Sequence, residues 1–364
     1  MPNYREVTFW LGLALPVVFI YGYTGATIPT QWPLLSATLG LSLWCTGRLT
    51  ALHWLGIAFV AYAVLSMSWA PKLYDSTGGL WKVAMWALAF WLGSTLASLT
   101  DLWKGLAIGL TVSSGVALLQ ALGYQLAGPY VGAGLFYNPT IAGASTALVL
   151  VALVSHQLWW YIPGILPGLL LANSRGAFAA VAVGLVCRYL HWSIALALLL
   201  VAGVFCWYGQ APSDVMRFHI WKVAYQNFSV LGFGCGSFVN IWFRFQGVTT
   251  HPEFVHNDFI QLAFEYGIGA LPVYAIFIAT LAQGRSEDWP TFATFTVLAL
   301  VFFPLYCPVP AFVGCVVAGH LARDRYLPRR DSRDRRLDFV SRLAQQRSNF
   351  DRSGGKVISL GPRD

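Results

Sequence analysis

Long apolar runs separated by short polar breaks extend along most of the chain. A helix needs roughly 17–25 mostly apolar residues to cross a bilayer, and most of these runs approach that length. Several contain proline, which membrane helices tolerate when neighbouring groups satisfy the freed carbonyl. We therefore predict about twelve membrane-spanning helices, at 7–23, 29–46, 51–69, 80–98, 102–122, 140–155, 158–172, 176–190, 193–208, 259–282, 290–306 and 309–321.

The composition excludes an ordinary water-soluble domain. Of the 364 residues, 57% are hydrophobic and only 10% are charged, whereas about a quarter of a soluble domain is charged. A large soluble core needs a polar shell, which this sequence cannot supply. We therefore predict an all-α integral membrane protein, with a polytopic domain over residues 1–321 and the bilayer as its solvent.

The net charge of +8 is concentrated in the C-terminal tail. Residues 322–364 contain 12 basic and 6 acidic side chains, which accounts for +6 of the total. A basic segment beside a last apolar run is typical of a cytoplasmic end that faces anionic lipids, so we expect no nucleic-acid partner. The polar composition of residues 328–364 predicts disorder. An even number of spans then places both termini in the cytoplasm.

The longest polar interruption, residues 209–258, is predicted to be an outer loop with structure of its own. Ser213 can cap a short helix that ends near Phe228. Aromatic side chains recur along this helix at three- and four-residue spacing, so one of its faces can lie on the bilayer surface.

Two arginines in the outer breaks are candidate ligands for an anion. Arg175 lies in LANSRGAF between two apolar runs, where an arginine must face a cavity, a partner or the interface. Arg217 lies on the predicted loop helix. Guanidinium groups suit a diphosphate because each can bind two oxygens at once. The alternatives are an interfacial snorkelling role for Arg175 and a solvated helix face for Arg217.

A polar cluster lies at the mouth of the span 259–282, in EFVHNDFIQLAFEYGIGAL. His256 can exchange protons near neutral pH, so it could act as a base toward a sugar hydroxyl or be a satisfied polar residue. Asn257 or Asp258 is the expected helix cap. Glu265 needs a partner inside a membrane helix, so it either pairs with an arginine or orients His256.

The sequence predicts neither a metal nor another cofactor. His251, Glu253, His256 and Asp258 depart from the one-face spacing of the HExxH pattern, and no cysteine cluster accompanies them. The glycine-rich run LGFGCGSF lacks the preceding strand and the following lysine that a phosphate-binding loop requires. We interpret this run as a tight turn that redirects the outer loop.

Three blocks of the chain, in this order, resemble the O-antigen ligase and polymerase superfamily. They are GLFYNPTIAGA, NSRGAFAA, and the stretch from RFHIWKVAYQNFSVLGFGCGSF to HNDFIQLAFEYGIGAL. The resemblance covers about residues 130–275. It implies a C-type glycosyltransferase architecture in the bacterial inner membrane, with the outer loop on the periplasmic side.

The resemblance also implies a reaction, the metal-independent, inverting transfer of a glycan from undecaprenyl diphosphate to an acceptor sugar hydroxyl. The acceptor is lipid A-core for a ligase and another lipid-linked glycan for a polymerase. The outer loop is short for many members of either kind, and loops carry the choice of acceptor. The implied site residues are Arg175 and Arg217 for the diphosphate, His256 as the base, and Asn257, Asp258 and Glu265 in support.

A transporter or flippase of an anionic lipid or solute is the alternative. It also explains outward-facing arginines and an intramembrane Glu265. It predicts charges near the midplane of the bilayer and symmetry between repeats. Most charges outside the tail instead gather at one face, and no internal repeat is visible in the sequence.

Overall fold

The computed structural model describes residues 4–17, 50–124, 126, 130–136, 138–190, 212–245, 252, 254–282 and 286–326. Residues 1–323 form one compact unit and residues 324–364 a second. The predicted spans 29–46 and 193–208 lie outside the described residues, as does the tail after Tyr326.

The described residues form helices joined by turns and include no strand, which confirms the all-α prediction for that part of the chain. The predicted span 259–282 is divided in the structure by a 3-10 turn at Gly267–Ala270. The helices are α1 (Tyr4–Val17), α3 (Ala51–Ser66), α4 (Leu73–Thr95), α5 (Thr100–Ala121), α6 (Pro139–Ser155), α7 (Ile162–Ala172), α8 (Arg175–Tyr189), α10 (Pro212–Gln226), α11 (Phe238–Ile241), α12 (Asp258–Tyr266), α13 (Leu271–Leu281), α14 (Trp289–Val301) and α15 (Pro308–Tyr326).

Two stretches among the described residues are long and apolar enough to cross a membrane. They are Thr100–Ala121, which is α5, and Asp258–Leu281, which joins α12 and α13 through the 3-10 turn. Six shorter apolar helices accompany them, including α3, α6 and α14.

A helix cap is found in the structure where a short polar residue directly precedes an apolar run. Asn138 caps α6 by accepting a hydrogen bond of 2.7 Å from the backbone nitrogen of Thr140, and Pro139 occupies the first helical position. The predicted cap at Ser213 is wrong, because α10 already begins at Pro212. The rigid ring of proline suits the first helical turn, and the helix starts two residues before residue 214, the first helical position that a cap at Ser213 implies.

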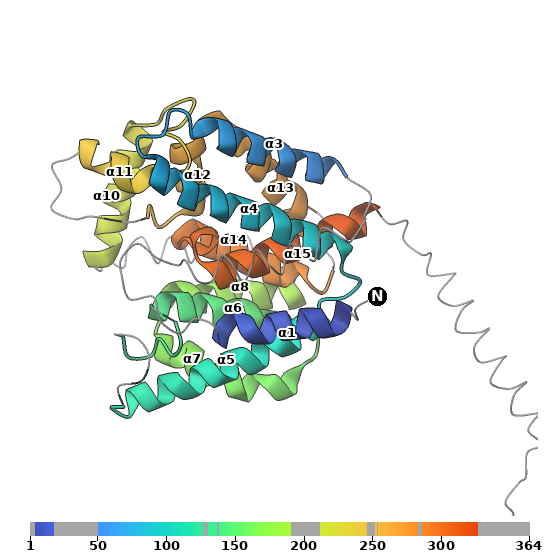
Figure 1. The fold of residues 1–364 in the computed structure, drawn as a ribbon. Coiled ribbons are helices and arrows are strands. Elements are labelled where there is room, and N and C mark those ends of the chain that lie inside the picture. Colours follow the sequence, from blue (N-terminus) through green and yellow to red (C-terminus); the bar gives the residue numbers. More distant parts are fainter. Residues whose placement is uncertain are drawn as a thin grey trace, which may run out of the picture. The chain divides into compact units, whose positions relative to one another are not determined.

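Glycines allow two pairs of helices to approach closely. A Cβ atom added at Gly93 of α4 would collide with the backbone of Val316 in α15, and one added at Gly319 of α15 would collide with Phe90 in α4. Gly12 of α1 and Gly105 of α5 approach the partner helix in the same reciprocal way. Both pairs of helices lie side by side in Figure 1. Small residues at helix contacts are typical of membrane proteins, where backbones pack without a large hydrophobic gain.

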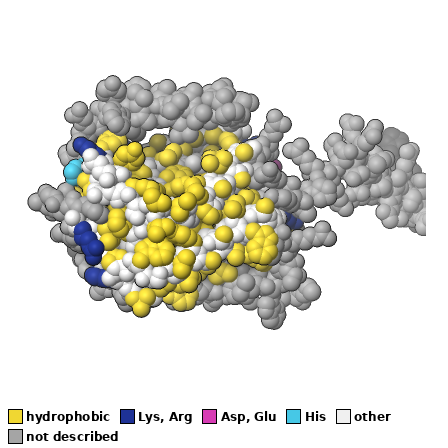
Figure 2. All heavy atoms as spheres, turned by 90° about the horizontal axis from the view of Figure 1, so that it is seen from above, with side chains coloured by type: hydrophobic (Ala, Val, Ile, Leu, Met, Phe, Trp, Pro, Cys, Tyr) yellow, Lys and Arg dark blue, Asp and Glu magenta, His cyan; other side chains and the backbone are white. Residues whose placement is uncertain are grey.

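The outward faces of several helices carry large apolar side chains. Trp54 and Leu65 of α3, Trp81 of α4 and Ile278 of α13 all have more than half of their surface exposed, between 56% and 68%. Figure 2 shows hydrophobic side chains spread over one face of the molecule, with most of the visible lysine and arginine, and the visible histidine, at one edge. An apolar patch on this scale marks a surface that contacts lipid or another protein.

Asp288 anchors the N-terminal end of α14. Its carboxylate lies 2.7 Å from His156 Nε2, accepts a bond of 3.3 Å from Trp103 Nε1, and lies 3.5 Å from His320 Nε2. Asp288 is buried. These contacts join the ends of α5 and α6 and the helix α15 to the start of α14, so the position of that helix is fixed at this end.

Candidate functional site

Asn257 caps α12 and also connects this helix to the far end of α14. Its Oδ1 atom accepts a hydrogen bond of 3.0 Å from the backbone nitrogen of Ile260. Its Nδ2 atom donates to the carbonyl oxygen of Leu300 at 2.9 Å. The sequence offered Asn257 or Asp258 as the cap, and the structure assigns this role to Asn257.

Asp258 holds the segment that follows α14. The side chain is 1% exposed, and its Oδ2 atom accepts a hydrogen bond of 2.9 Å from the backbone nitrogen of Leu305. This bond fixes residues 302–306 beside the loop that contains His256.

His256 has an unusual backbone and a buried ring. Its φ of +59° lies in the left-handed region, which a residue with a Cβ atom enters at a cost of about 1–2 kcal/mol. The ring packs edge-on against Phe303 at 5.0 Å between centroids. Its Nδ1 atom is buried and has no hydrogen-bond partner among the described residues. Strained residues persist where the surrounding structure fixes them, and they cluster at functional sites.

The pKa of His256 is lowered to about 4, first because the ring is buried and second because of the nearby positive charge of Arg217. The imidazole is therefore neutral at pH 7, with one ring nitrogen able to accept a proton. A neutral imidazole is the form that a general base requires.

Arg217 lies on α10 and meets the C-terminal end of α14. Its Nη1 atom donates to the carbonyl oxygen of Val301 at 3.4 Å, and the residue is half-buried. Together with its charge effect on His256, this contact brings Arg217 and His256 to the same place in the structure.

Arg175 is the first residue of α8, and its side chain is exposed. Ser174 caps the helix by accepting a hydrogen bond of 3.4 Å from the backbone nitrogen of Ala177. A Cβ atom added at the next residue, Gly176, would lie 3.3 Å from a side-chain methyl group of Val301. The start of α8 therefore packs on the residue whose carbonyl Arg217 contacts.

Glu265 is buried, 2% exposed, and its carboxylate has several partners. Gln261 Nε2 donates to Oε1 at 3.2 Å and Tyr306 Oη donates to Oε2 at 3.1 Å. The cation that interacts with Glu265 is Lys82, whereas the sequence favoured an arginine. Lys82 Nζ lies 5.2 Å from the ring centroid of Tyr306 and 5.6 Å from that of Phe254. Lys82 lies near the start of the predicted span 80–98, and nothing in the sequence indicates that it interacts with Glu265.

The run LGFGCGSF forms a turn against the end of α12. Gly232, Gly234 and Gly236 all have positive φ, between 65° and 99°, a region that glycine enters at no steric cost. The backbone nitrogen atoms of Phe233 and Gly234 donate to the carbonyl oxygens of Phe264 and Glu265 in the last turn of α12, at 3.1 and 2.9 Å. This turn supports the helix that carries Glu265.

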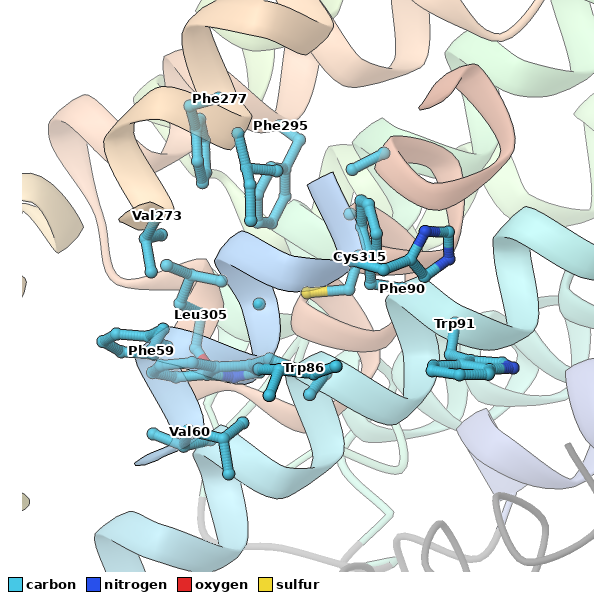
Figure 3. Close-up of a pocket in the computed structure, with 18 of the residues that line it drawn as sticks. Phe59, Val60, Trp86, Phe90, Trp91, Val273, Phe277, Phe295, Leu305 and Cys315 are labelled. Carbon is cyan, nitrogen blue, oxygen red and sulfur yellow. The ribbon is translucent and has the colours of Figure 1, made fainter. Parts of the chain in front are cut away.

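An apolar cavity of about 340 Å³ lies next to this site. It is bounded by α3, α4, α13, α14 and α15, and Figure 3 shows the aromatic rings of Phe59, Trp86, Phe90 and Phe295 around it. At one end Trp86 Nε1 donates to the carbonyl oxygen of Leu305 at 2.8 Å. The backbone nitrogen of Leu305 also donates to Asp258, so Leu305 connects the cavity lining to the polar cluster.

Among the residues that the structure describes, no group of three or more histidine, cysteine, aspartate or glutamate side chains could hold a metal ion. His251 and Glu253, two of the four residues weighed as metal ligands, lie outside that part of the chain. No family model and no curated protein sequence matches the chain.

Proposed function

We propose that this protein transfers a glycan from undecaprenyl diphosphate to an acceptor sugar hydroxyl at the periplasmic face of the bacterial inner membrane, as an O-antigen ligase or an O-antigen polymerase. The observation that carries the proposal is that Arg217 bonds to Val301 and its charge acts on His256, while Gly176, the residue after Arg175, packs against Val301. Two cations and a neutral imidazole suit a diphosphate leaving group and an attacking hydroxyl.

The membrane environment is part of this proposal. About twelve helices cross the bilayer, with both termini in the cytoplasm and the outer loop in the periplasm. The two apolar stretches of spanning length and the exposed tryptophan and isoleucine side chains of α3, α4 and α13 support it. Reciprocal glycines between α4 and α15 also favour packing within lipid.

The arginines stabilise the leaving group. In the transfer the acceptor oxygen bonds to the anomeric carbon as the bond from that carbon to the diphosphate oxygen breaks, and the electron pair leaves with the lipid diphosphate. Arg175 and Arg217 hold the negative charge that develops there, which is worth more in a water-poor site than in bulk water. Attack in line with the leaving group inverts the anomeric configuration.

His256 accepts the proton of the attacking hydroxyl. In the protein alone Arg217 helps to keep the imidazole neutral. A bound diphosphate offsets that positive charge, so the pKa of His256 rises toward its ordinary value and the ring becomes a stronger base when the donor is in place. Asn257, Asp258 and Glu265 hold the loop and helix around it and do not touch the reacting atoms.

The apolar cavity supports a lipid-linked donor. Leu305 lines this cavity, and its backbone nitrogen bonds to Asp258, two residues after His256; we place isoprenoid units of the donor in this space. Burying such units contributes about 25 cal/mol per Å² of apolar area. A soluble sugar nucleotide would make no use of this space.

The test replaces Arg175, Arg217 and His256 separately by alanine in cells that lack the native gene. Each variant is expected to insert into the membrane and to abolish transfer of surface glycan. Arg244→Ala is the matched control, because Arg244 is an exposed arginine of the same outer loop. Normal glycan ladders from the His256→Ala strain would remove histidine from the mechanism.

A deletion strain distinguishes the two acceptors. If long lipid-linked glycan accumulates while the lipid A-core remains uncapped, the protein is the ligase. If only single repeats reach the surface, it is the polymerase. If the surface glycan is unchanged, neither assignment holds.

A further inference from the structure

The backbone of Val255, the residue before His256, is held by side chains from two helices. Trp221 Nε1, on α10, donates to the carbonyl oxygen of Val255 at 2.8 Å. The nitrogen of Val255 donates to Gln261 Oε1, on α12, at 3.0 Å. Val255 is buried, so its N–H and its carbonyl would each be costly to leave without a hydrogen-bond partner.

Trp221, Val255 and Gln261 form a clamp, and Gln261 links this clamp to the buried carboxylate of Glu265. Gln261 uses its other amide atom to donate to Glu265 at 3.2 Å, and Tyr306 donates to the same carboxylate at 3.1 Å. With Nε2 donating to Glu265, Oε1 of Gln261 is the atom that faces Val255. Glu265 and Tyr306 therefore fix the orientation in which Gln261 can hold the loop.

The clamp also connects the two groups that lie at the end of α14. Trp221 follows Arg217 by four residues on α10, so both side chains project from one face of that helix. The bond from Trp221 to Val255 thus ties the helix that carries Arg217 to the peptide next to His256. At His256 the backbone adopts its left-handed conformation, with φ +59°, which the surrounding contacts must maintain.

We infer that Trp221 and Gln261 are positioning residues that set the separation and orientation of His256 and Arg217 by clamping the backbone of Val255 between α10 and α12. The inference rests on the proposed function for its effect on catalysis. The effect on the histidine itself is independent of any activity. Neither side chain touches the reacting atoms; both act through the peptide groups of residue 255.

The first test measures His256 directly in the purified full chain in detergent. Diethyl pyrocarbonate modifies neutral, accessible imidazoles, and peptide mass spectrometry separates His256 from the other six histidines. In Trp221→Phe, which removes the indole N–H together with part of the ring system, modification of His256 at pH 7 is expected to be about tenfold faster because the loop loosens. Gln261→Met, of similar length, is expected to act in the same direction.

Matched controls use residues of the same type that lie outside the clamp. Trp160→Phe changes a tryptophan that is 95% exposed, and Gln226→Met changes an exposed glutamine at the end of α10. Both are expected to leave the modification rate of His256 unchanged. Thermal unfolding checks that both variants are folded. If His256 is then modified at the wild-type rate in both Trp221→Phe and Gln261→Met, the inference is overturned.

The second test measures glycan transfer from the lipid-linked donor. Misalignment of the base is expected to lower kcat by about tenfold in Trp221→Phe while the KM for the donor changes little. A rise in KM at unchanged kcat would contradict a positioning role. If the wild-type protein itself shows no transfer, the proposed function fails, and the clamp is then judged by the modification rates alone.

Discussion

The imidazole of His256 and the guanidinium of Arg217 interact electrostatically beside the end of α14. Burial of the ring, and after it the charge of Arg217, lower the pKa of His256 to about 4. Above that pH the ring is neutral, and it becomes protonated as the pH falls through the lowered value. A base at this position is thus lost only in acid.

Arg217→Gln is expected to raise the pKa of His256, because one of the two causes that lower it is removed. The midpoint of His256 modification by diethyl pyrocarbonate, followed against pH, then moves upward from about 4. Arg244→Gln, in the same loop but exposed, is expected to leave the midpoint in place. An unchanged midpoint in Arg217→Gln would show that burial alone lowers the pKa.

Asp258→Ala is expected to destabilise the protein by about 1–3 kcal/mol, since the buried backbone nitrogen of Leu305 loses its acceptor. Thermal unfolding of the purified protein measures the change. Asp258→Asn keeps an oxygen that can accept this bond and is expected to be milder. Equal stability of the alanine variant and the wild type would mean that another acceptor replaces the carboxylate.

Gly93→Leu is expected to destabilise the protein by about 1–3 kcal/mol, because any Cβ atom at this position collides with the backbone of Val316 in α15. Gly115→Leu is the control, since a Cβ atom there would have no neighbour within 4 Å. The unfolding temperature of Gly93→Leu should fall below that of Gly115→Leu. A drop of the same size in both variants would refute a specific close approach of α4 and α15 at Gly93.

Gly56→Leu is expected to weaken binding of the lipid-linked donor without loss of stability. Gly56 lines the apolar cavity and has open space around its missing Cβ atom, so leucine can fill part of that volume and also favours the helix by roughly 0.5–1 kcal/mol. The KM should rise for a donor with a full isoprenoid chain and stay constant for one with a truncated chain. An equal change in the KM for both donors would show that the cavity does not bind the isoprenoid chain.

Short-range features of this protein could be predicted from the sequence. Asn138 and Asn257 cap helices because a small polar side chain directly before an apolar run reaches the free backbone nitrogens of the first turn. The glycine run forms a turn for a similarly local reason, since its backbone adopts positive φ. Such signals depend only on neighbouring residues.

Long-range partners could not be predicted in this way. The interaction of Lys82 with Glu265 and the bond from Leu305 to Asp258 join segments that are distant in the chain. Their pairing depends on how the helices pack, which hydropathy does not encode. The backbone conformation of His256 is equally invisible in the sequence, because the clamp on Val255 that accompanies it is formed by side chains of two other elements.

Helix α14 is held at both ends, by Asp288 at its start and by Arg217 and Asn257 at Val301 and Leu300. Its 13 residues give a helix about 20 Å long. A tilt of about 5° at the Asp288 end would displace Val301 by about 1.7 Å, and errors of about 1 Å in a reacting geometry can slow chemistry a hundredfold. Substitutions at His156 or Trp103, which contact Asp288 at the opposite end of α14, would thus disturb the alignment of the groups near Val301.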